Sequence, residues 1–228
     1  GMSLGFQNAG FKIVGSFDSW DCAVDCYAKN LSHTIKKVDL SNDEMAIKTI
    51  QKMKPELIMG GPPCQDFSNA GNRQEGERAY LTLTFAKIVK GIKPRFFIME
   101  NVENITRSKT YIDAKEIFRE AGYGITEKLL DASFCGVPQK RKRFFCIGER
   151  DGNDGFLESS LSTNQSIFPL TVREYFRQQN CRLDIDYYYR HPRSYSRRAI
   201  FSIDEPSPTI RGVNRPKPIA AMARTHNA

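Results

Sequence analysis

The order of apolar and polar positions divides the first 150 residues into short strands and amphipathic helices. Six apolar runs rich in β-branched and aromatic residues predict strands at 11–17, 36–40, 56–60, 95–100, 123–131 and 143–149. Four segments between them repeat apolar residues with the helical period, at 21–29, 43–53, 80–92 and 111–121. Strands that alternate with helices predict an α/β fold, in which a mostly parallel twisted sheet carries helices on both faces.

Two local signals add detail to this pattern. The stretch "SNDE" before the second helix has the spacing of a capping box from Ser41 to Glu44. Parallel strands end at one edge of a sheet, where α/β proteins bind their ligands. The polar or reactive residues that follow four of the predicted strands are Asp18 and Trp20, Asp39, Cys64, and Glu100.

The pattern changes near residue 150. The stretch 149–166 is polar and rich in turn-forming residues, which predicts a linker or loop. A short helix is expected at 171–179, and the Arg/Tyr-rich residues that follow show little helical periodicity. We therefore predict two domains, at 1–165 and 166–228.

The net charge of +8 is distributed unevenly along the chain. Residues 1–136 hold 18 Lys and Arg against 17 Asp and Glu, whereas residues 137–228 hold 16 against 9, and 13 of those 16 are arginine. Arginine binds phosphate and guanine through two parallel hydrogen bonds, so a nucleic-acid partner is favoured for the second half. A basic surface that only keeps the protein in solution is the alternative.

The six cysteines lack paired CxxC spacing, so we expect reduced thiols. Cys22 and Cys26 are four residues apart in a predicted helix, but no histidine or second cysteine pair completes a metal site, and none is predicted. No apolar run approaches the roughly 18 residues that span a membrane. The N-terminus also lacks a signal pattern, which predicts a cytoplasmic protein with no membrane partner.

Cys64 stands in "GGPPCQDFS", directly after a predicted strand. Pro62 and Pro63 fix the backbone before it and exclude helical geometry there, so the thiol is mounted on a rigid loop. A cysteine thiolate is a strong nucleophile at neutral pH. A buried structural cysteine is the alternative for this position alone.

Two further clusters could act on a ring substrate. Glu100 ends the strand that runs into "MENV", where a carboxyl group could share a proton with a ring nitrogen or serve only as a surface acid. Gln139, Arg141 and Arg143 alternate in "GVPQKRKR", so their side chains are expected on one side of an extended segment. They would form a clamp for an anion or a carbonyl group, or else a solvated basic face.

Together, in this order, these blocks closely resemble the C5-cytosine-specific DNA methyltransferase family. The matching blocks are "PCQ" at Pro63, Cys64 and Gln65, "ENV" at 100–102, and "QxRxR" at 139–143; "GMSLGFQNAGF" resembles the end of the family's glycine-rich cofactor motif. The resemblance implies a Rossmann-like methyltransferase domain at 1–165, whose first strand is missing. It also implies a smaller, partial target-recognition domain at 166–228, where "DEPSPTIRG" resembles part of the recognition region.

The resemblance also implies a mechanism for a DNA (cytosine-5)-methyltransferase. The thiolate of Cys64 adds to C6 of a flipped-out cytosine, and C5 then takes a methyl group from S-adenosyl-L-methionine, leaving S-adenosyl-L-homocysteine. Glu100 holds the N3 and N4 edge of the base, and Arg141 and Arg143 contact the O2 side.

Cofactor and DNA contacts are implied by the same resemblance. Trp20 is assigned to the adenine ring and Asp39 to its exocyclic amine, with Leu40 packing nearby. Ser19 stands where the family usually has an acid for the ribose, which makes Asp18 the candidate. Pro62 and Leu81 are expected to line the cofactor and target pockets. The expected DNA contacts are Gln65, Ser68, Gln139, Arg193, Arg197 and Arg211.

The family's first strand and the leading part of its glycine loop should precede Gly1, and its late motifs are absent. We therefore expect part of a longer protein, or else a degenerate copy that does not bind cofactor. The expected setting is a bacterial modification methylase that acts as a monomer on double-stranded DNA, with a cognate restriction endonuclease as an optional partner.

Three alternative functions compete with this one. A tRNA cytosine-5 methyltransferase would use the same blocks, although the arginine-rich region favours DNA. A non-catalytic nucleic-acid-binding homologue would keep the blocks without turnover. A cysteine hydrolase is excluded, because His33, His191 and His226 lie far from the motifs at the strand ends.

Overall fold

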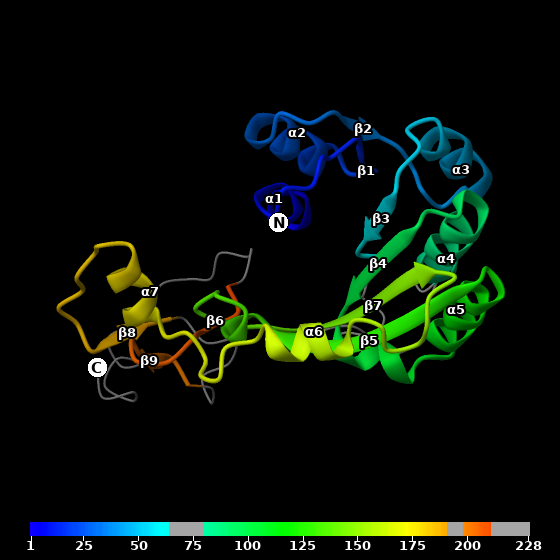
Figure 1. Ribbon diagram of the computed structural model, residues 1–228. Helices are drawn as coiled ribbons and strands as arrows, with labels where there is room; N and C mark the ends of the chain where they lie inside the picture. Colours follow the sequence, from blue (N-terminus) through cyan, green and yellow to red (C-terminus); the bar gives the residue numbers. More distant parts are fainter. Residues whose placement is uncertain (64–79, 191–197, 211–228) are drawn as a thin grey trace. The chain divides into compact units, whose positions relative to one another are not determined.

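The computed structural model describes residues 1–63, 80–190 and 198–210, which form two compact units (Figure 1). Unit 1 comprises Gly1–Lys128 and Phe144–Glu158, and unit 2 comprises Leu129–Arg143 and Ser159–Ala228. The functional boundary at residue 165 stays a prediction. In the described residues, no helix combines the length and apolar character needed to cross a membrane.

Unit 1 is built around one sheet with the strand order β3-β4-β7-β5. The elements up to β7, in chain order, are α1 (Met2–Asn8), β1 (Ser16–Asp18), α2 (Asp21–Asn30), β2 (Ile35–Lys37), α3 (Asp43–Gln51), β3 (Leu57–Gly60), α4 (Tyr80–Ile92), β4 (Phe96–Asn101), the 3₁₀ helix η1 (Glu103–Arg107), α5 (Lys109–Glu120), β5 (Tyr123–Asp131), the 3₁₀ helix η2 (Ala132–Phe134), β6 (Gln139–Lys140) and β7 (Lys142–Arg150). Of these, η2, β6, the end of β5 and the first two residues of β7 belong to unit 2. Strand β3 is parallel to β4, and β1 is parallel to β2. Strand β7 runs antiparallel to β4. The α/β class is therefore confirmed, but the central sheet is mixed where the sequence predicts a mostly parallel one.

The alternation of side chains along β4 decides which face of the sheet is covered. Phe97, Met99 and Asn101 are buried, while the residues between them are only half-buried. Phe97 stacks on Phe118 of α5 with ring centroids 4.0 Å apart, and its edge contacts Phe85 of α4. Helices α4 and α5 therefore cover this face, and α3 packs against α4 beside them (Figure 1).

Two glycines let the aromatic side chains of this core approach the sheet. A Cβ atom at Gly148 would lie 2.0 Å from the ring of Phe97, its partner in the β4–β7 register. A Cβ atom at Gly60, which ends β3, would lie 2.7 Å from the ring of Phe85. Each ring occupies the volume that a larger residue would need, which is a packing reason for glycine in a strand.

Four sequence predictions need correction. The strand expected at 11–17 is confined to β1, and the strand expected at 36–40 becomes β2 at Ile35–Lys37. The capping box at Ser41 is wrong, because Asn42 caps α3 by accepting a hydrogen bond from the Met45 backbone N–H at 3.0 Å. Part of the expected loop at 149–166 is the helix α6 (Glu158–Thr163).

The described part of unit 2 contains short elements joined by long connections. They are η2, β6, α7 (Val172–Gln178), β8 (Tyr187–Tyr189), β9 (Ile200–Ser202) and β10 (Ser207–Pro208), with most of α6. Strands β8 and β9 form an antiparallel pair, in which Tyr188 stacks on Phe201. Strand β10 pairs in parallel with β6, so the chain around residue 207 supports the strand that begins at Gln139.

The Phe97 side chain should dominate the stability of unit 1. It is fully buried and contacts three other aromatic rings, so Phe97→Ala should lower the free energy of unfolding by about 3–5 kcal/mol. Ile112→Ala, on the exposed side of α5, is the control and should change it by less than about 0.5 kcal/mol. Urea denaturation followed by circular dichroism measures both, and equal losses would contradict this account of the core.

Candidate active site

The ends of β3 and β4 meet at one edge of the sheet in unit 1. The parallel register pairs Gly60 with Met99, so the next residues, Gly61 and Glu100, lie side by side. A Cβ atom at Gly61 would stand 3.2 Å from Oε2 of Glu100. The carboxyl group of Glu100 is therefore directed at the backbone that leaves β3, on the face opposite α4 and α5.

A buried amide joins the same two strand ends. Nδ2 of Asn101 donates a hydrogen bond to the carbonyl oxygen of Pro62 at 3.2 Å, and its Oδ1 accepts one from the Val102 backbone N–H at 2.8 Å. The Asn101 side chain is only 2% exposed, so both bonds are shielded from water. This amide fixes the first proline of the "PPC" segment to the strand that carries Glu100.

A second group of predicted residues lies at the ends of β1 and β2. Oδ1 of Asp18 accepts a hydrogen bond from the Trp20 backbone N–H, and the Asp18 backbone oxygen accepts one from Val38. The indole of Trp20 is 66% exposed at the start of α2. Asp39 follows one residue after Val38, so an aromatic face and two carboxyl groups gather at this edge.

Asp39 is held as a carboxylate in the exposed turn after β2. Its Oδ1 accepts a hydrogen bond from the Ser41 backbone N–H at 2.9 Å, which lowers the pKa of the Asp39 carboxyl group. Leu40, beside it, is half-buried, as is Leu81 in the first turn of α4. These apolar side chains and an ionised acid are the residue types that hold an adenosine group.

The predicted clamp residues belong to unit 2. Gln139, Arg141 and Arg143 are half-buried while Lys140 and Lys142 between them are exposed, so burial alternates along this segment as predicted. The Arg141 backbone N–H donates to Oδ1 of Asp131 at 3.1 Å. Nη1 of Arg143 donates to the carbonyl oxygen of Lys142 at 2.7 Å.

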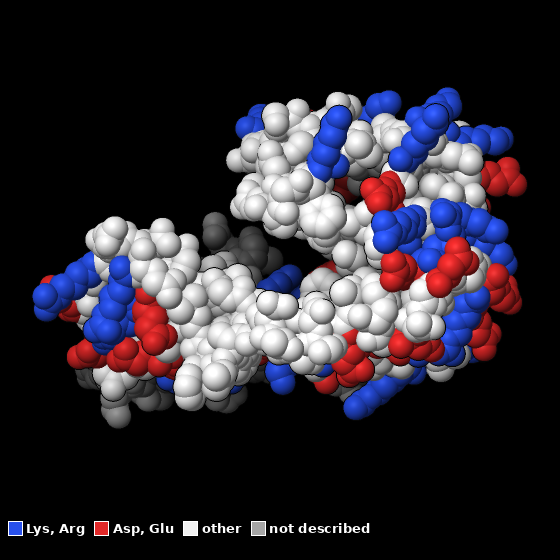
Figure 2. Space-filling model, viewed as in Figure 1, with Lys and Arg blue, Asp and Glu red and all other residues white. Residues whose placement is uncertain are grey.

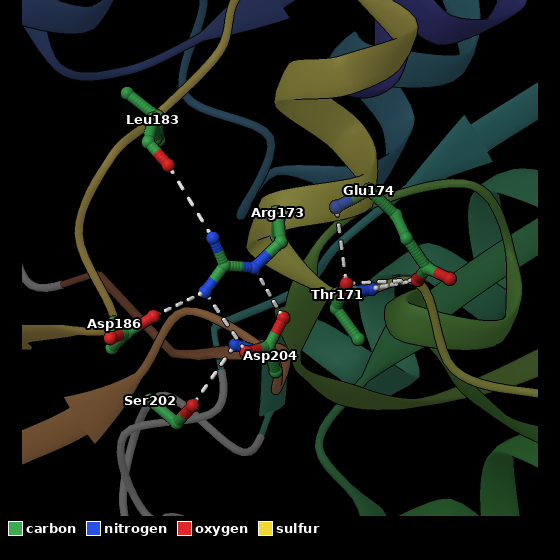
Figure 3. A network of polar contacts seen from close by, with 7 residues as sticks. All are labelled: Thr171, Arg173, Glu174, Leu183, Asp186, Ser202 and Asp204. Atoms are coloured by element: carbon green, nitrogen blue, oxygen red, sulfur yellow. Dashed lines mark hydrogen bonds and ion pairs between the residues drawn. The ribbon is translucent and has the colours of Figure 1, made fainter.

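An ion-pair network organises the helix α7 of unit 2 (Figure 3). Arg173 donates to both carboxyl oxygens of Asp204, at 2.6 and 3.0 Å, and to Oδ1 of Asp186 at 3.0 Å. These bonds lower the pKa of Asp204. Thr171 and Glu174 form a capping box at the start of the same helix. Arg173 therefore connects α7 to the end of β9 and to the residue before β8.

Six predicted site residues lie outside the described part of the chain. They are Cys64, Gln65, Ser68, Arg193, Arg197 and Arg211. Within the ranges that the structure does describe, no group of three or more His, Cys, Asp or Glu side chains could hold a metal ion.

The fold and the edge that carries Glu100 are those of an α/β methyltransferase. The profile of C-5 cytosine-specific DNA methylases matches residues 1–210. The chain therefore belongs to the C-5 cytosine-specific DNA methylase family, enzymes that methylate C5 of cytosine in DNA and use S-adenosyl-L-methionine. This assignment confirms the family, the fold class and the enzyme class expected from the sequence.

Two curated relatives match nearly the whole chain. The type II methyltransferase M.HindV of Haemophilus influenzae is 52% identical over 96% of this chain and 71% of its own length. The type II methyltransferase M.HgiDI of Herpetosiphon aurantiacus is 54% identical over 99% of this chain and 72% of its own length. The chain thus spans a little over two thirds of each relative.

Solved structures agree with this fold. A protein described as a DNA modification methyltransferase encoded within an E. coli prophage aligns with a TM-score of 0.61 and 27% identity, over 85% of this chain and 55% of that one. The S. pombe Dnmt2 methyltransferase aligns with a TM-score of 0.63 and 19% identity, over 76% of this chain and 55% of its own. The second likeness supports the fold alone.

The residues at the ends of β1 and β2 fit the cofactor of this family. An exposed indole offers a face for the adenine ring, and the ionised Asp39 can accept a hydrogen bond from its amine. Asp18 uses Oδ1 to hold the Trp20 backbone, which leaves Oδ2 for a ribose hydroxyl. The donor set and the apolar neighbours are therefore compatible with S-adenosyl-L-methionine.

Sequence reasoning missed three residues that organise these sites: Asn101, Asp131 and Arg173. Asn101 stands inside the "ENV" block, but its sequence neighbours do not reveal a bond to Pro62, 39 residues away. The spacing of Thr171 and Glu174 is a capping-box signal that could have located the start of α7. The bonds of Arg173 to Asp186 and Asp204 depend on tertiary structure.

Asn101→Ala should destabilise the protein and also slow its reaction with DNA. Loss of the amide leaves the Pro62 carbonyl oxygen without this donor, which should cost about 1–3 kcal/mol of folding free energy. It should also reduce, on the order of tenfold, the rate of covalent trapping, in which the enzyme forms a lasting adduct with DNA that contains 5-fluorocytosine.

Thr126→Val is the matched control, because buried Thr126 accepts a hydrogen bond from the Leu157 backbone N–H elsewhere in unit 1. It should lower stability similarly and leave the trapping rate unchanged. Equal slowing in both variants would show that Asn101 acts only through global stability.

Proposed function

We propose that Cys64 is the nucleophile of this DNA cytosine-5 methyltransferase and that Glu100 acts on the same base. The observation that carries this proposal is the junction of β3 and β4, where the carboxyl group of Glu100 would lie 3.2 Å from a Cβ atom at Gly61 and the Pro62 carbonyl oxygen accepts a hydrogen bond from Asn101. Cys64 follows Pro62 by only two residues in the chain, and this short connection supports the proposal that Cys64 and Glu100 act on one base.

The chemistry assigned to Cys64 begins with attack of its thiolate on C6 of cytosine. A bond forms between sulfur and C6, the C5–C6 double bond is lost, and C5 becomes nucleophilic. S-adenosyl-L-methionine supplies the methyl group that C5 takes. Loss of the C5 proton to a base then expels the Cys64 thiolate, which restores the double bond and frees the methylated base.

Glu100 assists this attack by holding the base at its N3 and N4 edge. Its half-buried carboxyl group at the strand end is suited to donate or share a proton with N3, which withdraws electrons from C6 and makes it a better electrophile. We assign Arg141 and Arg143 to the O2 side of the base, where a guanidinium group stabilises negative charge on the ring. We assign cofactor binding to Asp18, Trp20, Asp39, Leu40, Pro62 and Leu81.

DNA recognition is assigned to the basic second part of the chain. Unit 2 holds 15 Lys and Arg against 6 Asp and Glu, so the whole net positive charge of the protein belongs to it, whereas acidic and basic side chains are interspersed over the helices of unit 1 (Figure 2). A positive unit attracts the phosphate backbone, and Arg173 is engaged with acids of its own unit, which leaves other arginines for DNA. Gln65, Ser68, Gln139, Arg193, Arg197 and Arg211 are the proposed contacts.

The bacterial type II relatives support a proposal for the biological setting. We propose a modification methylase that acts as a monomer on double-stranded DNA in the cytoplasm of a bacterium. A cognate restriction endonuclease that cuts the same sequence is the proposed counterpart, since methylation of C5 would protect the host sites from it.

Covalent trapping tests the assignment of Cys64. The full-length protein is incubated with S-adenosyl-L-methionine and a duplex that contains 5-fluorocytosine, where the fluorine cannot leave as a proton does, so the adduct persists. Cys64→Ser should abolish the trapped complex and reduce methyl transfer at least about 1,000-fold, while DNA binding stays near wild type.

Cys146→Ser is the control, because Cys146 is fully buried in the core of unit 1. This variant should still form the trapped complex. Methyl transfer by Cys64→Ser near the wild-type rate would remove this thiol from the mechanism. A complex with tRNA but none with DNA would select an RNA substrate, and no complex with either would indicate a binding protein without turnover.

The salt dependence of DNA binding tests the proposed arginine contacts. Replacing Arg193, Arg197 or Arg211 by Gln should flatten the slope of log K against log salt by about 0.9 for each phosphate contact that is lost. Arg119→Gln is the control, since Arg119 pairs with Asp154 in unit 1 and should leave the slope unchanged. Slopes equal to wild type in all three variants would refute these assignments.

A further inference from the structure

Residues 131–141 of unit 2, which include Gln139, form a loop whose two ends are hydrogen-bonded to each other. We call this closed loop the ring. It leaves β5 at Asp131, passes through η2 and a turn in which Gly136 has φ +78°, and returns at Arg141. Inside the ring, the Val137 backbone N–H donates to the carbonyl oxygen of Ala132. Asp131 and Arg141 are ten positions apart in the chain but lie next to each other.

The carboxyl group of Asp131 closes this ring. Its Oδ1 accepts three hydrogen bonds, from the Ser133 backbone N–H at 3.1 Å, from the Ser133 hydroxyl at 3.0 Å, and from the Arg141 backbone N–H at 3.1 Å. The first two are those of an ordinary helix cap. The third is not needed to cap η2, and it joins the cap to the predicted clamp.

The peptide groups of Arg141 are held on both sides. While its N–H is bonded to Asp131, its carbonyl oxygen accepts a hydrogen bond from the Ala132 backbone N–H at 3.1 Å. Further along the same segment, the Thr209 hydroxyl donates to the carbonyl oxygen of Lys140. The position and direction of the Arg141 backbone are thus fixed by the two residues at the base of the ring.

The charge of Asp131 suits this role. Burial acts to raise the pKa of its carboxyl group, but the hydrogen bonds from Ser133 and Arg141 outweigh burial and lower it, so Asp131 is ionised at neutral pH. Hydrogen bonds to an ionised acceptor are stronger than those between neutral groups. A carboxylate therefore holds the ring more firmly than a neutral cap would.

We propose that Asp131 is a positioning residue for the methyl-transfer reaction, acting through the backbone of Arg141. It sets the point from which the Arg141 guanidinium reaches the O2 side of the target cytosine. The inference rests on the proposed function, since it requires that Arg141 contacts the base.

A double-mutant cycle in the full-length protein tests this coupling. The rate of trapping on 5-fluorocytosine DNA is measured at saturating DNA and S-adenosyl-L-methionine for Asp131→Ala, Arg141→Ala and the double variant. Asp131→Ala should slow trapping on the order of tenfold, with little change in the KM for S-adenosyl-L-methionine. In the Arg141→Ala background, Asp131→Ala should have almost no further effect, because the guanidinium that it positions is gone.

Two further variants separate positioning from folding. Asp131→Asn keeps an oxygen that accepts from Ser133 and Arg141, so it should recover trapping to within about threefold of wild type. Asp154→Ala is the matched control: Asp154 also accepts a hydrogen bond from a backbone N–H, that of Ile125, but in unit 1. It should lower the unfolding temperature without slowing trapping.

The outcomes distinguish a failure of the proposed function from a failure of the positioning role of Asp131. If wild-type protein forms no trapped complex, the proposed function fails. If wild type is trapped and Asp131→Ala slows it equally with and without Arg141, the positioning role is wrong and Asp131 only stabilises unit 2. Slowing by Asp154→Ala of the same size would also overturn the inference.

Discussion

The parallel pairing of β3 with β4 is the constraint on which the candidate active site depends. The register from Leu57 and Phe96 onward brings both strands to the same edge and sets Gly61 beside Glu100. Because side chains alternate between faces, a slip of one residue would turn Glu100 into the core and Asn101 away from Pro62. The buried aromatic cluster on α4 and α5 prevents that slip, since Phe97 and Met99 must face it. Packing on one face of the sheet thereby fixes the chemistry on the other.

The sequence predicted the long periodic elements well and the short ones poorly. The helix predicted over 80–92 ends at Ile92 as predicted, and the strand predicted over 123–131 has these same bounds, because a long segment contains many residues that indicate its type. Strand β1 is only three residues long. Phe11 and Val14, which the prediction included in this strand, lie before it and are exposed, so apolar character alone overestimated its length. The placement of Glu100 near the end of β4, and of Trp20 and Asp39 just after β1 and β2, could be predicted because polar residues that interrupt or follow an apolar run mark the end of a strand; their roles stay predictions. Asn101 and Asp131 could not, since their partners are distant in the chain or depend on how a loop closes.

The two units differ in charge as well as in structure. Unit 1 has nearly equal numbers of acidic and basic residues, and it contains Glu100 and the residues proposed to bind the cofactor. Unit 2 is strongly basic, yet several of its arginines are already committed: Arg173 to Asp186 and Asp204, Arg182 to Asp184, and Arg198 to Glu205. Of these acids, Asp186 and Asp204 connect α7 to the chain around β8 and β9. Net charge therefore overstates the number of arginines that are available to a polyanion.

The close approach of Phe97 to Gly148 restricts which substitutions these two positions can accept. The phenyl ring occupies the volume above its partner strand, and it also stacks on Phe118, so it has little room to move aside. Any residue with a side chain at position 148 would have to be accompanied by a smaller one at position 97. Substitutions at these two sites should therefore appear together among relatives, with glycine opposite an aromatic ring or a larger residue opposite an aliphatic one. The pair would report on the β4–β7 register even where the rest of the strands has diverged.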